Sequence, residues 1–287
     1  MFRVSAYDKP FLAAGNGDIP TTLSITDWGS LTTYSANRRS VLSCACEGGN
    51  TELVTILLQR HADPSQYQSP SLQHSFIRAQ HESIKILINY MRPEEIKYWM
   101  NGIRDTTSLQ ILYDHNIDLS SSLLHKISDL EIAQYLLSHG ADVNAIDPST
   151  NRNPLHYAND PDVASFLVHA GTKIEQRDND GMTPLNILSS SIFDLFSTID
   201  TLLNEGADIN SRNNIGRSPL LSACEMGNVS TVRVLLDHGA DISVRDNAGR
   251  SVYDMPKLQT VERRNREIAK TDKMMLIMLH EYENNIK

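Results

Sequence analysis

The sequence predicts an all-α solenoid of about 7–8 helix–turn–helix units with irregular units at both ends. Three observations predict this fold. Residues 216–242, GRSPLLSACEMGNVSTVRVLLDHGADI, have the pattern of a helix, a turn, a second helix and a loop. Similar stretches return about every 33 residues along the chain. Each unit also carries apolar residues on faces that it cannot cover alone, so adjacent units must bury them.

The unit at 216–242 shows how each element is specified. Ser218 is expected to cap the first helix and Pro219 to begin it, because proline lacks the N–H that a first turn leaves unpaired. Gly227 and Asn228 end this helix, since both residues tolerate a positive φ. A second helix follows with apolar residues from Val232 to Leu236, and Gly239 is expected to end it.

Copies of this unit lie upstream, each with a related opening and a related close. They begin GMTPL at 181, NPLH at 153, LLH at 123 and VLS at 41, and three of them close with GADIN at 206, GADVN at 140 and HAD at 61. This T-P-L-H-type opening and G-A-D-x-N-type close resemble the ankyrin repeat. The resemblance implies an all-α ankyrin-repeat solenoid, and it implies that the usual activity is to bind another protein.

The spacing within the units is uneven. From Pro219 to Gly239 is 20 positions, whereas from Pro184 to Gly206 is 22 and from Pro154 to Gly171 is 17. The long unit predicts a small insertion around 189–193. The short units, at 123 and 154, are expected to lack most of the turn between their helices.

The predicted organisation is a repeat array over 1–256 followed by C-terminal capping helices over 257–287. Within the array, 1–36 is a degenerate N-terminal cap, 69–121 holds the weakest repeats and 122–248 the best ones. We expect 94–121 to open first, because stability in such a stack comes from the interfaces between repeats. The Met-rich segment 272–282 is expected to cap the stack, and the alternative is a helix that binds a partner.

Bulk composition limits the classes of function. The formal net charge of −9 argues against nucleic acid as a partner, since such binding depends on neutralising phosphates. The N-terminal residues lack the apolar stretch of a signal peptide, and the longest apolar run, 274–279, is too short to span a membrane. Three cysteines suit a reducing compartment. These features predict a soluble, monomeric, cytoplasmic protein, acting in the cytoplasm of a host cell if it is an effector.

No residue pattern predicts catalysis, cofactor binding or metal binding. Cys46 and Cys224 are expected to pack in the core, and no closely spaced cysteine or histidine pair supplies metal ligands. His115, His139 and His238 fall at the ends of second helices, where the helix dipole favours a cation. The family resemblance implies that His125 and His156 are hydrogen-bonding framework residues. The sequence has no glycine-rich phosphate loop, H-E-x-x-H or G-x-S-x-G motif.

The remaining variable positions predict a surface that binds a partner protein. They lie at the loop tips and on the solvent side of the first helices, which together line the concave face that the family resemblance implies. Tyrosine and arginine lead the choice because they are frequent hot spots in interfaces. The predicted partner-binding residues are Tyr157, Arg177, Asn179, Arg212, Asn214, Ser222, Glu225, Arg245 and Glu47.

The sequence therefore predicts a non-enzymatic interaction module that acts as an adaptor, scaffold or inhibitor. Its degenerate repeats resemble stand-alone ankyrin proteins that intracellular bacteria or large DNA viruses direct at host proteins, and a eukaryotic regulator is the other origin. Two alternatives stay open. One is an enzyme with its chemistry in 69–121 or in the C-terminal tail, and the other is a nucleic-acid or anionic-lipid contact through the basic run at 263–266.

Overall fold

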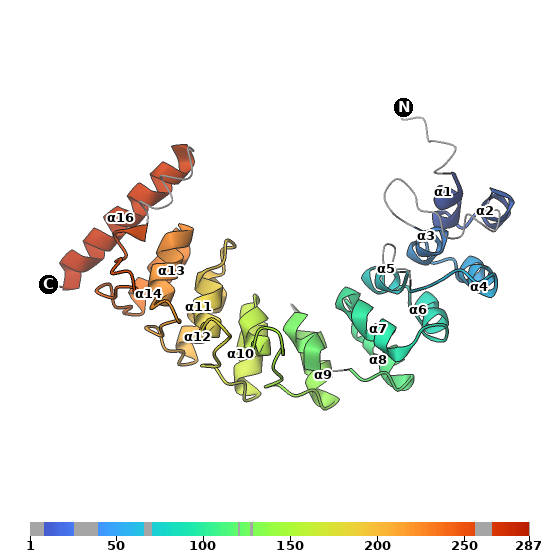
Figure 1. Ribbon diagram of the computed structural model, residues 1–287, viewed down its shortest axis with the longest axis horizontal. Helices are drawn as coiled ribbons and strands as arrows, with labels where there is room; N and C mark the ends of the chain where they lie inside the picture. The colour runs from blue at the N-terminus through green and yellow to red at the C-terminus, as the bar shows by residue number, and fades with distance from the viewer. Residues whose placement is uncertain are drawn as a thin grey trace. The chain divides into compact units, whose positions relative to one another are not determined.

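A computed structural model describes residues 9–25, 40–65, 71–119, 121–126, 129–255 and 266–286. Every regular element in these ranges is a helix, which confirms the all-α solenoid (Figure 1). The chain divides into unit 1, Met1–Leu123, and unit 2, Leu124–Lys287. In the described part of the chain, no helix combines the length and the apolar character that a membrane span requires.

Unit 1 is built from pairs of short helices whose first and second members pack in separate rows. The first helices α1, α3, α5 and α7 follow one another in contact, and so do the second helices α4, α6 and α8. Their side chains form the core, where Leu42, Leu57, Phe76, Leu87 and Leu112 are almost completely buried. The bounds are α1 Lys9–Gly15, α2 Ile19–Ile25, α3 Val41–Glu47, α4 Thr51–Gln59, α5 Ser71–Ile77, α6 His81–Ile88, α7 Pro93–Trp99, η2 Met100–Gly102 and α8 Thr106–Asp114.

Unit 2 repeats this arrangement. The first helices η4, α11 and α13 contact one another in order, and the second helices α9, α10, α12 and α14 form the other row. The bounds are η3 Ser121–Lys126, α9 Leu130–Ser138, η4 Pro154–Tyr157, α10 Pro161–His169, α11 Pro184–Ser189, α12 Phe196–Asn204, α13 Pro219–Met226, α14 Val229–Asp237 and α16 Arg266–Ile286. One hydrophobic core runs through the unit from Leu155 to Leu279.

The pair α13 and α14 has the caps that its sequence predicts. The Ser218 hydroxyl accepts a hydrogen bond from the backbone N–H of Leu221 at 3.3 Å, and Pro219 begins the helix. Gly227 ends α13 with φ at +73°, a conformation that a residue with a Cβ adopts only at a cost in energy. Asn228 then caps α14 by accepting from the N–H of Thr231.

Both short units begin with a 3₁₀ helix, η3 of six residues and η4 of four. The turn that follows η3 lies partly outside the described residues, so the prediction for that unit stays a prediction. In the unit at 154, residues 158–160 connect η4 to α10, and the expectation that this turn was missing is wrong, because the shortening falls on the first helix. In the second of these units, Pro161 begins α10, and the residue before a proline avoids the helical conformation, so η4 has no room to extend.

The long unit contains the predicted insertion. α11 ends at Ser189 and α12 begins at Phe196, whereas only Gly227 and Asn228 separate the helices α13 and α14. The extra residues extend the turn between the two helices of this repeat. Their contacts are described below.

The last described helix, α16, packs against α14. Met275 and Leu279 are buried in the core of unit 2, and the Tyr253 hydroxyl donates to Glu283 Oε2 at 2.8 Å. Burial and the Glu283 carboxylate raise the pKa of Tyr253 to about 12. Capping of the array by this segment stays a prediction. The basic run considered as a nucleic-acid or lipid contact lies outside the described side chains.

Candidate functional site

The loops that join successive repeats in unit 2 end in hairpin tips, and one Asp or Asn side chain organises each tip. Asp178 Oδ1 accepts hydrogen bonds from the N–H groups two and four residues later, and Asn213 and Asp246 do the same. A residue with positive φ follows in each tip, and Gly181 is one example. A Cβ on Gly181 would lie 2.3 Å from Asn214 Oδ1, so neighbouring tips pack too closely for a larger residue.

Arginine side chains link each tip to the next one. Arg177 Nη1 donates to the Gly181 carbonyl oxygen at 3.0 Å and to the Arg212 carbonyl oxygen at 2.7 Å. Arg212 repeats this pattern one unit later, with bonds to the carbonyl oxygens of Gly216 at 3.0 Å and Arg245 at 2.5 Å. Arg245 in turn donates to the carbonyl oxygen of Gly249 in its own tip. The arginines therefore brace the tips in their order along the chain.

Asparagine side chains link each tip to the preceding one. Asn179 Nδ2 donates to the Ser149 carbonyl oxygen at 2.9 Å, and Asn214 Nδ2 donates to the Asn179 carbonyl oxygen at 3.1 Å. Asn247 continues the series by donating to the Asn214 carbonyl oxygen at 3.1 Å. We call the arginine and asparagine bonds between tips 147–152, 177–182, 212–217 and 245–250 the tip ladder.

Four of the predicted partner-binding residues, Arg177, Asn179, Arg212 and Asn214, donate bonds of the tip ladder, and a fifth, Arg245, accepts one through its carbonyl oxygen while its side chain bonds within its own tip. All five are exposed at the surface, and polar groups of all five form hydrogen bonds within the chain. Their contact with a partner stays a prediction. The structure gives them a second role, which is to hold the tips at fixed spacing.

The other four predicted residues lie on first helices or at their ends. Tyr157 donates from its hydroxyl to Asp147 Oδ2 at 3.3 Å and meets the His125 ring edge to face. Glu225 pairs with Arg217. Ser222 is only 4% exposed, so a partner can contact little of it. Glu47, in unit 1, pairs with Arg78 at 3.0 Å.

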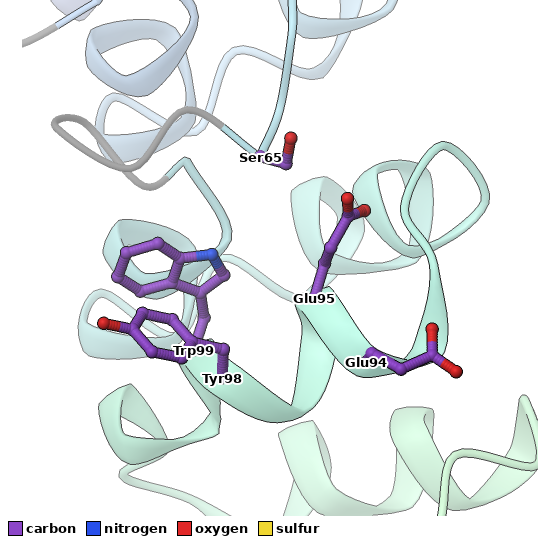
Figure 2. A pocket seen from close by; sticks show the side chains of 5 residues that line it. All are labelled: Ser65, Glu94, Glu95, Tyr98 and Trp99. Carbon is purple, nitrogen blue, oxygen red and sulfur yellow. The ribbon is translucent and has the colours of Figure 1, made fainter.

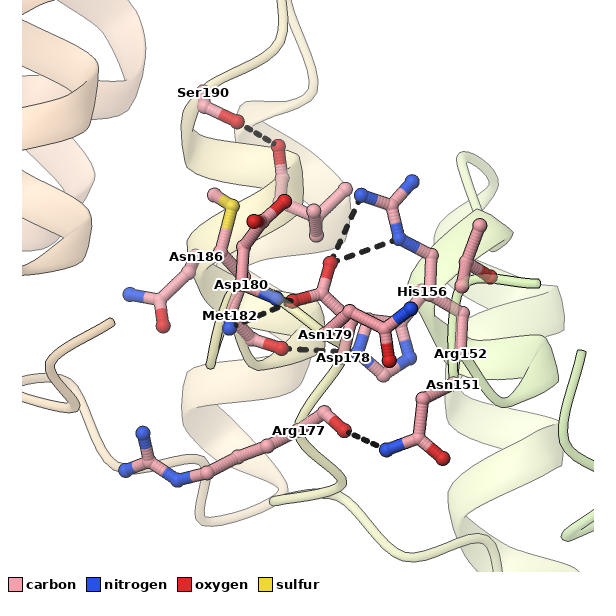
Figure 3. Close-up of polar contacts among 12 residues, drawn as sticks. Asn151, Arg152, His156, Arg177, Asp178, Asn179, Asp180, Met182, Asn186 and Ser190 are labelled. Atoms are coloured by element: carbon pink, nitrogen blue, oxygen red, sulfur yellow. Dashed lines mark hydrogen bonds and ion pairs between the residues drawn. The ribbon is translucent and has the colours of Figure 1, made fainter. Parts of the chain in front are cut away.

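A buried ion pair joins the first two tips of the ladder (Figure 3). Both Nε and Nη2 of Arg152 donate to Asp178 Oδ2, at 3.0 and 2.9 Å, and the Asp178 side chain is 2% exposed. His156 lies beside this pair, and its Nε2 donates to the Met182 carbonyl oxygen at 3.2 Å. Burial lowers the pKa of His156 against the opposing effects of that carbonyl and of Asp178, which favours the neutral ring.

The structure confirms the framework roles expected for the histidines. His125 Nε2 donates to the Ala145 carbonyl oxygen at 3.0 Å, as His156 does to that of Met182. His115, His139 and His238 each follow the last residue of a second helix, and each donates from Nδ1 to the carbonyl oxygen four residues earlier. These rings cap helix ends.

The cysteines are core residues, as predicted. Cys46 and Cys224 are completely buried, and burial raises the pKa of each thiol to about 12. A thiol with so high a pKa carries almost no thiolate near neutral pH, so neither side chain is suited to act as a nucleophile.

Unit 1 contains a hollow of about 280 Å³ in the region where the alternative prediction placed an enzyme (Figure 2). It is lined by Ser65, Glu94, Glu95, Tyr98 and Trp99. The Ser65 hydroxyl donates to Asp63 at 2.7 Å, and Glu95 accepts from Arg92 at 2.6 Å. The lining therefore offers no pairing of a nucleophile with a histidine base. Among the described residues, no cluster of His, Cys, Asp and Glu is arranged to hold a metal ion.

Sequence reasoning missed an exposed apolar loop in the insertion between α11 and α12. Ile192 is 76% exposed, Phe193 67% and Phe196 45%. The signal was available, since Ile192 and Phe193 occupy the turn, and Phe196 begins the next helix, where the neighbouring repeat has a turn of glycine and asparagine. The repeat spacing predicted only that a small insertion lies around 189–193.

Three family models match parts of the chain, and all describe ankyrin repeats. They match residues 37–67, 124–168 and 159–246, which together make up more than half of the chain. The matched ranges contain helix pairs of both units. Ankyrin repeats of this kind indicate a protein-interaction module.

Curated proteins with similar sequences carry the same repeats. Ankyrin repeat and SOCS box protein 6 of Homo sapiens is 36% identical over 110 residues, which are 36% of this chain and 26% of that protein. Neurogenic locus notch homolog protein 2 of Homo sapiens is 35% identical over 126 residues, 42% of this chain and 5% of that protein. A putative ankyrin repeat protein of fowlpox virus is 30% identical over 139 residues, 37% of this chain and 31% of that protein.

The chain thus spans about a quarter of the length of the first of these relatives and less of the second. The similarity covers less than half of the chain in each case. The repeated helix pairs, the hydrogen-bonding histidines and the matching family models agree with one another, and the chain belongs to the ankyrin-repeat family.

Proposed function

We propose that this chain is a non-enzymatic adaptor, scaffold or inhibitor that binds a partner protein through the hairpin tips and first helices of unit 2. The tip ladder is the observation that supports this proposal. Its arginine and asparagine bonds fix the spacing of successive tips before any partner arrives. A surface that is already ordered loses little conformational entropy on binding, and this favours affinity.

The contact surface comprises exposed and half-buried groups in and around the ladder. Tyr157, Arg177, Asn179, Arg212, Asn214, Glu225 and Arg245 are its proposed members in unit 2, with a small contribution from Ser222, and Glu47 is the proposed contact in unit 1. The arginines keep N–H groups that the ladder does not use, because each guanidinium has five donors. One side chain can therefore brace a tip and donate to a partner.

The setting of this activity is part of the proposal. We propose that the chain acts as a monomer in the cytoplasm, on a protein and not on nucleic acid. The similarity to a fowlpox virus protein is compatible with a viral or bacterial effector that binds a host protein. The similarity to human proteins is equally compatible with a cellular regulator.

The test is affinity purification with the full chain, followed by measurement of binding between purified proteins. We expect one protein to be enriched from a cytoplasmic lysate and to bind the purified chain directly with a defined stoichiometry. Tyr157→Ala, which removes a half-buried ring beside the tips, is expected to weaken that binding. No direct binding by any enriched protein would refute the proposed function.

A further inference from the structure

The loop between α11 and α12 presents apolar side chains that the fold itself does not use. We define the apolar knob as Ile192, Phe193 and Phe196, which have exposed fractions of 76%, 67% and 45%. No other large apolar side chain in the described part of the chain is as exposed as Ile192 or Phe193. Grouped exposed apolar residues are typical of interaction sites.

The backbone of this loop is held by the repeats on both sides. Asn228 Nδ2 donates to the Phe193 carbonyl oxygen at 3.2 Å, and the Ser230 hydroxyl donates to Asp194 Oδ2 at 3.1 Å. On the other side, the Thr198 hydroxyl donates to the Asn159 carbonyl oxygen at 2.8 Å and fixes the start of α12. The loop is therefore held by its neighbours, while its apolar side chains stay largely exposed.

The regular repeats show what the insertion changes. In unit 1, Asn50 Nδ2 donates to the Gly17 carbonyl oxygen, 33 residues earlier, and the acceptor is a glycine in a tight turn. In unit 2, Asn228 makes the corresponding bond over 35 residues, and the acceptor is Phe193. The two additional residues keep the bond between repeats and place apolar side chains where the regular turn has none.

The charges around the knob define the chemistry of its partner. From Met182 to Ser211 the chain contains no Lys or Arg, and it contains Asp194, Asp200, Glu205 and Asp208. The preceding turn is also acidic, with Asp160 and an exposed Asp162. A complementary surface is therefore apolar at its centre and basic at its rim. An anionic membrane does not fit this pattern, because its headgroups would be repelled.

The area of the knob alone is too small to hold two copies of this chain together. Three side chains with these exposures offer on the order of 300–400 Å² of apolar surface. A stable interface buries about 800 Å² on each partner. The knob has the size of a hot spot that lies within a larger interface.

We propose that the apolar knob inserts into an apolar pocket, rimmed by Lys or Arg, on the protein that this chain binds. The inference rests on the proposed function and adds a specific contact to it. The knob supplies the buried centre of the interface, and Asp162, Asp194 and Asp200 face the basic rim.

The experiment compares full-length variants against the purified partner. Ile192→Ser combined with Phe193→Ser removes the centre of the knob, and Ile277→Ser is the matched control, since Ile277 is a 48% exposed apolar residue on α16 of the same unit, away from the tips and the first helices. We expect the double variant to bind at least about 30-fold more weakly, the range of a hot spot, with an unchanged melting temperature. Ile277→Ser is expected to change affinity less than about threefold.

A second measurement covers the case in which the double variant does not fold. A benzophenone photo-crosslinking residue placed at position 193 is expected to form a covalent adduct with apolar pocket residues of the partner, and the same residue at position 277 is not. Asp194→Asn, which removes the charge and keeps an oxygen for Ser230, is expected to flatten the salt dependence of binding. A crosslink to a surface without basic neighbours would overturn the assigned pocket chemistry.

The outcomes separate the two proposals. Unchanged partner affinity of the double variant would overturn the knob and leave the proposed function in place. Failure of the wild-type chain to bind any protein would overturn both. Sedimentation of the wild-type chain, but not the double variant, with phosphatidylcholine or phosphatidylserine vesicles would assign the knob to a membrane. Dimerisation of the chain alone that the double variant abolishes would assign it to a second copy.

Discussion

Asp178 holds three groups at once, and its removal tests how the tips of unit 2 are stabilised. Its Oδ1 accepts from the N–H groups of Asp180 and Met182, both at 2.9 Å, and its Oδ2 accepts from Arg152. Asp178→Ala leaves these donors without a partner and leaves the guanidinium without its carboxylate. We expect this variant to lower the free energy of unfolding by about 3–5 kcal/mol, as breaking a buried ion pair does.

Equilibrium urea unfolding of the full chain measures this change. Asp180→Ala is the control, since Asp180 lies in the same tip with an exposed side chain, and it is expected to change stability by less than about 0.5 kcal/mol. Asp178→Asn keeps one oxygen for the two N–H groups and loses the charge, so its cost should fall between the two. A loss below about 1 kcal/mol in Asp178→Ala would refute the idea that this carboxylate fixes the tip.

Three further predictions follow from contacts described above. Arg212→Ala removes two bonds to carbonyl oxygens and is expected to lower the free energy of unfolding by about 1–2 kcal/mol, whereas a loss of partner affinity alone would assign the side chain to the interface. Burial acts to raise the pKa of Asp246, but hydrogen bonds from Arg250 and nearby N–H groups lower this pKa overall. The Asp246 carboxylate therefore stabilises the folded chain above the unfolded pKa near 3.8, and this contribution is lost as the pH falls below that value. The wild-type melting temperature should therefore fall more steeply between about pH 5 and pH 2 than that of Asp246→Asn, and equal slopes would contradict this. Met275→Ala removes a buried side chain of α16 and is expected to lower the free energy of unfolding in urea by about 2–4 kcal/mol. Met274→Ala, at an exposed site of the same helix, is expected to lower it by less than about 0.5 kcal/mol. Equal losses would rule out packing of this helix against the repeats.

Local signals in the sequence were enough to predict much of the fold. Ser218 and Pro219 specify a helix start, and Gly227 specifies its end, because each acts through the backbone of its own turn. His125 and His156 were identified through the family resemblance, and their bonds to carbonyl oxygens agree with it. The spacing also located the insertion before α12, since a change in repeat length is visible without a structure.

The features that the sequence did not reveal depend on contacts between repeats. In the sequence, Arg177 and Arg212 look like solvated tip residues. Their acceptors are carbonyl oxygens of the next tip, and no residue pattern identifies a carbonyl oxygen as an acceptor. The 3₁₀ form of η4 depends on how few residues lie between Asn153 and Pro161, and counting positions placed the shortening in the wrong element. The exposure of Phe193 depends on Asn228 holding its carbonyl group, which is a contact over 35 residues.

The tip ladder also has a consequence for how the chain tolerates mutation. Apart from the Asp178 carboxylate, which accepts from Arg152, the acceptors in the bonds from one tip to the next are main-chain carbonyl oxygens, which each amino acid provides. A substitution in one tip can remove a donor, but it leaves the acceptors that neighbouring tips use in place. Damage is then limited to the bonds of the substituted residue. Exposed tip positions outside the ladder, such as Ile215, can therefore change to suit a new partner without loosening the adjacent repeats.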